Sequence, residues 1–406
     1  MADDLIPVKQ LSEMTENLED IVRPLQLTTL VSNKVPKQVK PLYLPDKLPE
    51  KGMEMADLMR KFEEEHLSNY NVIEENQTLL HPYTKTSTLE DMRVDSPISV
   101  PPTLLGNGLG SMVNNPKFAR VCNPVDTEFE IEVCDTLASD LGLPSKYTYG
   151  ENGLGIINAN EYDGLLVILI SEKFSLRNKK EECKELSSDK FVVYASNRDI
   201  LHPLKRIAQM CDVTLVTYDS VPDLLQKLED KTTCPLLVIY DLDHDEEKRF
   251  NSEIEELGSY CKTNSIWLHL NLHDYGCFSL LTDYKFLTSD PNDYISSVIV
   301  DARRNFGTSF ESNIMWCKNR TKIYEGMHWK TQGENKFQYL SQKDTYTIDF
   351  KDYQVYLGKM NRAYKFWTVF NMYGMDAIRQ QLQDKVKAAQ SLISFIGSLE
   401  LDEKVE

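Results

Sequence analysis

The chain has 406 residues, which is enough for two or three domains or for one large α/β unit with appendages. Hydrophobic residues make up 41% and charged residues 27%, so collagen-like, fibrous and largely disordered classes are excluded. The 63 Asp and Glu outnumber the 45 Lys and Arg, and the resulting net charge of −18 is expected to repel nucleic acid and anionic membranes.

The start of the chain and its cysteines bear on the cellular compartment. The first residues lack the basic-then-apolar order of a signal peptide, and the longest apolar run, at 164–170, is far too short to cross a bilayer. The eight cysteines include no CxxC pair, which indicates isolated reduced thiols rather than a zinc module or a redox dithiol. We therefore expect a cytoplasmic protein that binds neither nucleic acid nor membrane.

Residues 1–110 are rich in proline and charge, so only short elements are expected between the prolines. The exception is the stretch 53–68, where Met55, Leu58, Met59 and Phe62 recur at helical spacing and predict one amphipathic helix. We interpret this region as an N-terminal arm that wraps around a neighbouring structure.

From residue 111 to about 345, apolar runs of strand length alternate with segments of helical spacing. Strands are expected at 191–195, 213–218, 235–240, 266–272, 297–300 and 314–317. Helices are expected at 160–176, 221–228 and 250–261, and a long helical stretch is expected from Tyr353 onward. This alternation predicts an α/β fold with a mostly parallel sheet covered on both faces, whose ligand site lies at the carboxyl ends of the strands.

An acidic loop follows the strand expected at 235–240. Asp241, Asp243 and Asp245 alternate in this loop, and carboxylates placed in this way can hold a hard divalent cation through oxygen ligands. The alternative is an acidic start to the next helix, because Asp and Glu stabilise the first turn of a helix.

Two other patterns allow a binding site. His269, Asn271 and His273 recur at period two, so one face of a strand could present two imidazoles to zinc; the alternative is a hydrogen-bonded structural pair. The glycine-containing stretch 152–155 precedes the helix expected at 160–176 and could cradle a phosphate. It has neither GxGxxG nor Walker spacing, so by itself it is a weak signal.

Several segments, taken in order, resemble the group II pyridoxal-phosphate decarboxylases, in particular the aromatic-L-amino-acid and histidine decarboxylase branch. The segment 349–359 reads DFKDYQVYLGK and is followed by KFW at 365–367 and MYG at 372–374. This order is similar to the family's long signature D-[YF]-[RK]-x-W-Q-[IV]-x-L-G-[RK]…K-x-W…M-Y-G. Further similarity lies in NPVDTEFE at 123–130, IWLH at 266–269 and MWCKN at 315–319.

The departures from the family pattern concern its chemistry. The resemblance places Arg304 where the family has the lysine that forms the Schiff base, and a guanidinium cannot serve as the imine nitrogen. It places Asn271 where the family has the aspartate that faces the pyridine nitrogen, and a neutral amide cannot stabilise a pyridinium. Lys285 and Lys318 are alternatives for a relocated imine.

Other positions that the resemblance assigns to the cofactor are also mostly substituted. Ile200 corresponds to the ring-stacking histidine, or His202 does if two residues are inserted. Tyr339 could correspond to the tyrosine of the mobile catalytic loop. The full set of positions equivalent to the cofactor-binding residues is Asn271, His269, Ile200, His202, Tyr162, Asp241, Asp301 and Arg303.

The resemblance implies a type I aminotransferase-like fold with a mostly parallel seven-stranded sheet. The large domain is expected at 111–345, and the arm at 1–110 is expected to embrace the partner subunit of a two-fold dimer. A C-terminal helical segment follows at 346–406, and the family's small C-terminal domain is expected to be missing.

We interpret the protein as a catalytically inactive decarboxylase-like protein with a binding or regulatory role. It is expected to form a homodimer or a heterodimer with an active relative, and covalent binding of pyridoxal phosphate is not expected. One alternative is a residual carboxy-lyase that uses pyridoxal phosphate on an aromatic L-amino acid or histidine. The other is a divalent-metal enzyme built on Asp241, Asp243 and Asp245.

Overall fold

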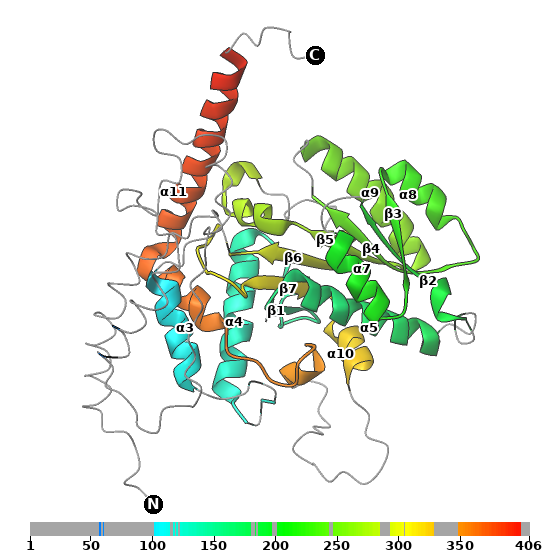
Figure 1. Ribbon diagram of the computed structural model, residues 1–406, viewed down its shortest axis with the longest axis horizontal. Coiled ribbons are helices and arrows are strands. Elements are labelled where there is room, and N and C mark those ends of the chain that lie inside the picture. The colour runs from blue at the N-terminus through cyan, green and yellow to red at the C-terminus, as the bar shows by residue number, and fades with distance from the viewer. Residues whose placement is uncertain are drawn as a thin grey trace, which may run out of the picture. The chain divides into compact units, whose positions relative to one another are not determined.

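The computed structural model describes most of the chain beyond residue 100 (Figure 1). The described residues are 57, 60, 101–113, 117, 119–120, 122–179, 183, 186–196, 201–242, 247–284, 293–303, 305–328 and 348–398. The helix expected at 53–68 lies outside them except for residues 57 and 60, and so do five site candidates: Ile200, Asp243, Asp245, Arg304 and Tyr339. The chain divides into two compact units, of residues 105–387 and of residues 1–104 with 388–406. The larger unit contains the sheet and both hollows described below.

A seven-stranded sheet forms the centre of the larger unit, as the resemblance implied. In spatial order its strands are β1 (Leu154–Asn158), β7 (Asn313–Cys317), β6 (Ser297–Asp301), β5 (Trp267–Asn271), β4 (Cys234–Asp241), β2 (Phe191–Ser196) and β3 (Thr214–Tyr218). The pairs from β6 to β3 are parallel, whereas β7 is antiparallel to both β6 and β1. β1, β4 and β6 therefore all run in the same direction and end at one edge of the sheet.

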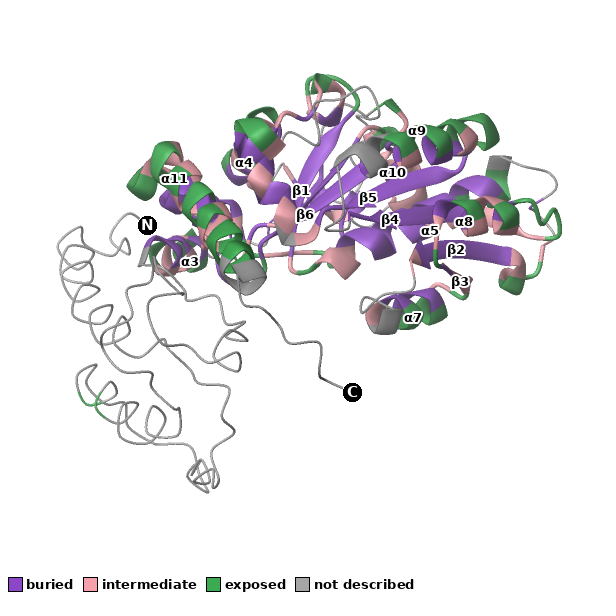
Figure 2. Cartoon of the chain, turned by 90° about the horizontal axis from the view of Figure 1, so that it is seen from above, coloured by how far each residue is buried: buried purple, intermediate pink, exposed green. Residues whose placement is uncertain are grey.

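Helices pack on the sheet and bury its strands (Figure 2). The helices are α3 (Pro101–Val113), α4 (Pro124–Leu141), α5 (Glu161–Lys179), α7 (Leu201–Met210), α8 (Val221–Leu228), α9 (Glu247–Asn264), α10 (Arg320–Met327) and α11 (Ala363–Ser398). Short 3₁₀ helices are η3 (Ser145–Tyr147), η4 (Ser188–Lys190), η5 (His273–Leu280), η6 (Thr282–Tyr284) and η9 (Phe350–Asp352). None of the described helices is long and apolar enough to cross a membrane.

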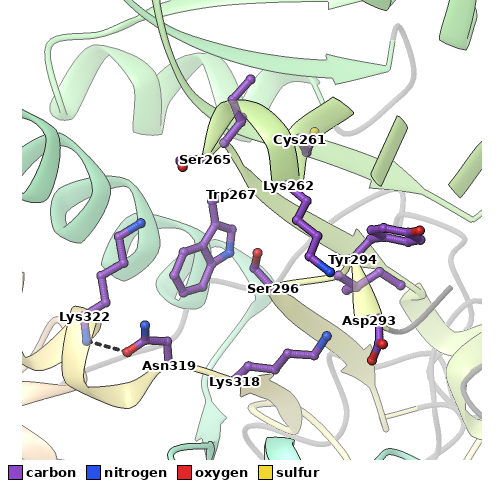
Figure 3. Close-up of a pocket in the computed structure, with 12 residues that line it drawn as sticks. Cys261, Lys262, Ser265, Trp267, Asp293, Tyr294, Ser296, Lys318, Asn319 and Lys322 are labelled. Carbon is purple, nitrogen blue, oxygen red and sulfur yellow. Dashed lines mark hydrogen bonds between the residues drawn. The ribbon is translucent and has the colours of Figure 1, made fainter. Parts of the chain in front are cut away.

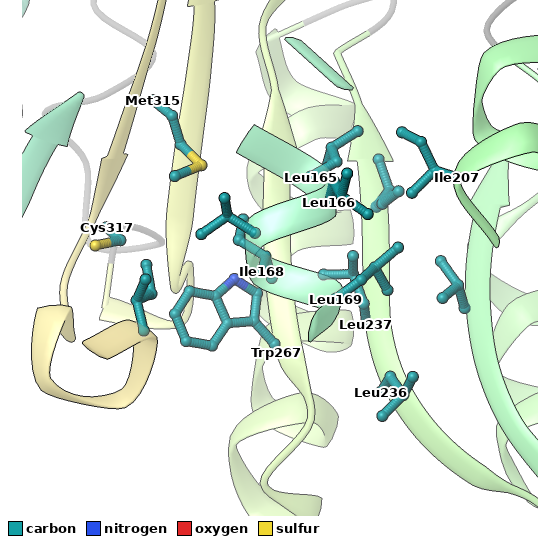
Figure 4. Close-up of a cluster of buried hydrophobic side chains, with 14 of the residues drawn as sticks. Leu165, Leu166, Ile168, Leu169, Ile207, Leu236, Leu237, Trp267, Met315 and Cys317 are labelled. Atoms are coloured by element: carbon teal, nitrogen blue, oxygen red, sulfur yellow. The ribbon is translucent and has the colours of Figure 1, made fainter. Parts of the chain in front are cut away.

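The core is concentrated around α5, whose residues 165–169 are all apolar and buried. These side chains meet Leu236 and Leu237 of β4, Trp267 of β5 and Met315 of β7 (Figure 4). This part of the helix is apolar on all sides because α10 covers the side that does not face the sheet, and a Cβ on Gly326 of α10 would lie 2.4 Å from the Cα of Ser171. Each fully buried aliphatic side chain of this kind contributes about 1.5 to 3 kcal/mol of transfer free energy.

Three expectations about local structure were wrong. The stretch 152–155 is not a phosphate loop, because Gly155 lies in β1, where a Cβ would meet Cys134 at 2.5 Å and Trp316 at 2.8 Å. Helix α11 begins only at Ala363, whose backbone N–H is capped by the side chain of Asn361, and residues 353–357 form bends. The prolines at 101 and 102 do not interrupt structure but open the 13-residue helix α3, because proline is tolerated in a first turn that lacks backbone acceptors.

A buried ion cluster ties α4 to β1 and to the segment before α11. Glu130 accepts hydrogen bonds from Nζ of Lys117 at 2.6 Å and from Nζ of Lys359 at 2.8 Å, and it also accepts one from the backbone N–H of Ile157. Both ammonium groups lie under 5 Å from the ring centroid of Phe350, at 4.7 and 4.8 Å. Burial opposes ionisation of Glu130, but the two ammonium groups prevail and lower its pKa to about 2. We refer to Lys117, Glu130 and Lys359 as the Glu130 cluster.

Candidate functional site

Polar residues gather where the parallel strands end, as expected for a sheet of this type. They come from five strands that end at this edge and from the start of β7: Asn158, Ser196, Asp241, Asn271, Asp301 and Asn313. A hollow of about 530 Å³ opens beside them. It is lined by Ala159, Asn160, Glu161, Tyr162, His273, Tyr275, Asp301, Arg303, Phe310, Glu311 and Asn313. The structure thus brings together three of the residues expected at the site, Tyr162, Asp301 and Arg303, and places Asn271 and Asp241 on the adjoining strand ends.

His273 lies between two carboxylates from different elements. Its Nε2 is 3.2 Å from Oδ1 of Asp241, and its Nδ1 is 3.6 Å from Oε2 of Glu161. Burial favours the neutral imidazole, but the interactions with Asp241 and Glu161 outweigh it and raise the pKa of His273 to about 10. At neutral pH this group is an imidazolium whose single positive charge is shared by two partly desolvated carboxylates, so the three groups together keep a net negative charge. We refer to Asp241, Glu161 and His273 as the His273 cluster.

The backbone holds His273 in an uncommon conformation. Its φ is +47°, in the left-handed region, so the chain leaves the sheet directly after Asn271 and enters η5. Such a conformation in a non-glycine residue costs free energy and persists only where the surroundings support it. The ion pairs of the His273 cluster provide such support.

Asn271 belongs to the same network through its side-chain amide. It is fully buried; its Nδ2 lies 3.4 Å from Oε2 of Glu161, and its Oδ1 accepts a hydrogen bond from the backbone N–H of His273 at 3.1 Å. An amide serves here as both donor and acceptor, which a carboxylate cannot do. An aspartate at this position would place a third negative charge next to Glu161.

The amino end of α5 is already capped by the chain itself. Oδ1 of Asn160 accepts a hydrogen bond from the backbone N–H of Asp163 at 3.0 Å, which satisfies one of the free donors of the first turn. Glu161 and Asp163 add two carboxylates to that turn. Although burial opposes it, the interactions with His273 and Tyr162 lower the pKa of Glu161, so this side chain is anionic. Burial and the neighbouring Glu161 raise the pKa of Tyr162.

Arg303 and Asp301 form the opposite wall of the hollow. The backbone N–H of Arg303 donates to Oδ1 of Asp301 at 2.9 Å, and its guanidinium lies 3.6 Å from Oδ2 of the same carboxylate. The guanidinium also lies 5.3 Å from the ring centroid of Phe310. The positive charge of this wall is therefore compensated within two residues.

The predicted zinc alternative at His269 and His273 was wrong. β5 ends at Asn271, so the two imidazoles do not share a strand face, and His269 is fully buried with Nδ1 2.7 Å from Oγ of Ser297. Burial lowers the pKa of His269 to about 3, so it is neutral. Within the described ranges, no three His, Cys, Asp or Glu side chains are grouped so that they could hold a metal ion. Asp243 and Asp245 of the predicted metal loop are outside those ranges, and nothing is described of the side chain of His202.

Glu161 and Ser196 are among the site residues that sequence reasoning did not single out. Oγ of Ser196 donates to Oδ2 of Asp241 at 2.5 Å and so helps to orient the carboxylate that faces His273. Glu161 opens the helix after β1, a strand that was not predicted because a glycine interrupts its apolar run. A prediction of β1 would have marked Glu161 as a residue at the carboxyl end of a strand.

Comparison with known proteins identifies what this arrangement is similar to. The model of the pyridoxal-dependent decarboxylase conserved domain matches residues 49–403. Tyrosine decarboxylase 2 of Narcissus pseudonarcissus is 24% identical, with 98% of this chain and 79% of that protein aligned. Aromatic-L-amino-acid decarboxylase of Rattus norvegicus is 23% identical over 73% of this chain and 64% of its own length.

Solved structures share the fold. The 4-hydroxyphenylacetaldehyde synthase of Rhodiola rosea superposes with a TM-score of 0.74 at 19% identity, covering 98% of this chain and 81% of that one. The tryptophan decarboxylase of Catharanthus roseus, solved with L-tryptophan, gives a TM-score of 0.73 at 17% identity, with 98% and 82% covered. The similarity therefore extends over nearly the whole of this chain.

Proposed function

The chain belongs to the pyridoxal-dependent decarboxylase family, and we propose that it is a catalytically inactive member that acts by binding another subunit. Pyridoxal phosphate is the cofactor of this family, and the tryptophan decarboxylase of Oryza sativa has been solved with it. The observation that carries the proposal is the His273 cluster, whose imidazolium is already paired with two carboxylates and leaves a net negative charge at the strand ends.

We infer that the described residues do not fit pyridoxal phosphate. A phosphate dianion is usually bound at a helix amino end, through free backbone N–H groups and the positive end of the helix dipole. At the amino end of α5, the side chain of Asn160 already accepts a hydrogen bond from one of these N–H groups. The carboxylates of Glu161 and Asp163 already place negative charge at the positive end of the helix dipole. In a partly desolvated site, like charges at contact distance repel by several kcal/mol.

The residues at the positions of the pyridine and imine contacts also do not fit the cofactor. A protonated pyridine nitrogen needs an anionic partner, whereas the amide of Asn271 is neutral and already bonded to Glu161 and His273. Arg304, at the family's imine position, cannot form a Schiff base because a guanidinium stays protonated and delocalised. Loss of the imine, of the ring partner and of the phosphate contact together supports the absence of decarboxylation.

The proposal is tested by the visible spectrum of the purified protein mixed with pyridoxal phosphate. We expect no imine absorbance that survives dialysis. Amine assays with aromatic amino acids and histidine are expected to match an empty-vector control. Borohydride reduction followed by peptide mapping would distinguish an adduct within residues 271–304 from one at Lys318, which follows β7 at the opposite edge of the sheet. An adduct within 271–304 that forms product amine would support the residual carboxy-lyase and contradict the proposal.

Restoring the lysine alone is expected to leave the protein inactive. In Arg304→Lys, the neutral Asn271 and the carboxylates at the start of α5 remain, so amine production should stay at background. Adding Asn271→Asp is expected to destabilise the protein, because the new carboxylate would face Glu161. Measurable decarboxylation by the single variant would show that the loss of the lysine is the main defect.

A subunit interface is supported by exposed apolar side chains on α3, on the segment 355–360 and on the first half of α11. They are Leu105, Met112, Val113, Tyr356, Leu357, Met360, Trp367, Met372 and Tyr373. The two helices pack closely, since a Cβ on Gly106 would lie 2.7 Å from the Cα of Lys365, so the exposed side chains of α3 and α11 come from neighbouring elements. Exposed apolar groups gathered in this way are typical of an interaction site.

We propose that a second copy of the chain covers this surface. Leu357→Asp, at a side chain that is 62% exposed, is expected to convert dimers into monomers without loss of fold, as measured by light scattering and circular dichroism. Met210→Asp is the matched control, because Met210 is 64% exposed at the end of α7 and outside this surface. A wild-type chain that stays monomeric at micromolar concentration would count against the homodimer, and capture of an active relative would then indicate the heterodimer.

A further inference from the structure

A second hollow, of about 260 Å³, lies at the opposite edge of the sheet from the His273 cluster (Figure 3). It is bounded by the last turns of α9, the starts of β5 and β6, and the residues after β7. Its lining residues with hydrogen-bonding or charged side chains include Lys262, Asp293, Ser296, Lys318, Asn319 and Lys322. This location separates it from every position that the family resemblance assigns to the cofactor.

Among the described residues around this hollow, positive charge exceeds negative charge. Lys262 and Lys318 extend their side chains toward the same space beside Asp293 (Figure 3). Lys146 forms an ion pair with Asp293, and Nζ of Lys322 lies 2.6 Å from Glu172. Among the described residues, four lysines thus face two carboxylates, which gives an excess of two positive charges when Lys318 is protonated.

The ammonium groups of both lysines lie near aromatic rings, although Lys262 is exposed and Lys318 is partly buried. Nζ of Lys318 lies 5.0 Å from the ring centroid of the buried Tyr147, and Nζ of Lys262 lies 5.5 Å from that of Tyr294. Aromatic faces stabilise ammonium groups in such positions. Around the partly buried Lys318 the ring also keeps part of the water shell away, so an arriving anion would be attracted more strongly than at an open surface.

We propose that this hollow binds a small phosphorylated metabolite, whose phosphate is held by the ammonium groups of Lys262 and Lys318. Lysine binds phosphate as a point charge, and the excess of two positive charges matches a phosphate monoester dianion. The hydroxyl of Ser296 lines the same wall and can donate a further hydrogen bond. The volume admits a small monoester and is below the range typical of nucleotide or drug-sized ligands.

The charge state of Lys318 supports this assignment. Burial and the neighbouring Lys146 and Lys262 lower the pKa of Lys318 to about 7, while Asp293 acts in the opposite direction. A bound dianion would favour the protonated amine. Binding should therefore take up a proton near neutral pH and weaken as the pH rises above the pKa of Lys318.

The first test uses the unmodified protein and glycerol 3-phosphate as the probe. Lysine acetylation is followed by mass spectrometry with and without about 5 mM of the probe, a concentration that detects millimolar binding. We expect the probe to slow acetylation of Lys262 and Lys318 and to leave Lys227 unaffected. Lys227 is a matched control because it is half-buried and pairs with Asp223 on α8. Acetylation rates at Lys262 and Lys318 that the probe does not change would overturn the proposal.

The second test measures binding by titration calorimetry. Lys262→Met and Lys318→Met are each expected to weaken glycerol 3-phosphate binding by about tenfold, and Lys227→Met to leave it unchanged. Wild-type affinity is expected to fall several-fold between about pH 6.5 and about pH 8.5, the range in which Lys318 loses its proton while the phosphate stays a dianion. Affinity that is the same in the variants and in the wild type would rule out this hollow as the site. If a variant does not fold, the acetylation test on the wild-type protein decides.

Discussion

Glu130→Gln is expected to lower the free energy of unfolding by about 3 to 5 kcal/mol, because it leaves the ammonium groups of Lys117 and Lys359 buried without a counter-charge. Both lysines are more than nine-tenths buried, so neither can recover its hydration without opening the structure. The loss should be measured by urea denaturation at neutral pH. The slope of the denaturation curve depends on the surface that unfolding exposes, which the substitution leaves almost the same. The slope should therefore stay unchanged and the midpoint should fall.

Glu128→Gln is the matched control on the same helix. Glu128 pairs with Arg120 at 2.5 Å, but the two side chains are 48% and 43% exposed. An exposed pair of this kind contributes about 0 to 1 kcal/mol. Equal effects of the two substitutions would show that the Glu130 cluster contributes no more than a surface ion pair.

His273→Gln is expected to lower the free energy of unfolding by about 2 to 4 kcal/mol below pH 6.5, because Asp241 and Glu161 lose their shared positive charge. The pKa of His273 is raised in the folded state to about 10, above the value near 6.5 of an unperturbed histidine. Its contribution to stability is therefore fully present below pH 6.5 and declines as the pH rises from there through 10. The difference between wild type and variant, measured by urea denaturation, should shrink over that range.

His328→Gln provides the comparison for His273→Gln. Nδ1 of His328 lies 3.1 Å from Oδ1 of Asp352, so this substitution also removes an imidazole beside a carboxylate, but away from the His273 cluster and with one carboxylate instead of two. A larger and more pH-dependent loss at His273 would support the cluster as a permanent ion network. A difference between wild type and His273→Gln that does not change with pH would show that His273 is neutral there.

The sheet could be predicted largely from local pattern, whereas two of its details could not. The runs at 191–196, 234–241 and 267–271 are of strand length and mostly apolar, so they predict buried strands wherever they lie in the fold. β1 was missed because its glycine is required by the close approach of Cys134 and Trp316, a tertiary contact. The pattern at 269–273 predicted one continuous strand face, but the left-handed backbone at His273 ends the strand earlier.

The sequence by itself determined the family, through the motifs at 123–130 and 349–374. The assignment of Arg304 and Asn271 to the positions that carry the family's chemistry also comes from the sequence, and it stays a prediction. Those statements depend on residue identity and order alone. Only the tertiary structure decided that Glu161, Asp241 and His273 meet, because they come from three elements and become neighbours only when β1, β4 and β5 end at the same edge of the sheet. Hydrophobic periodicity is a local signal, whereas the charge balance of a site depends on which strand ends the fold places side by side.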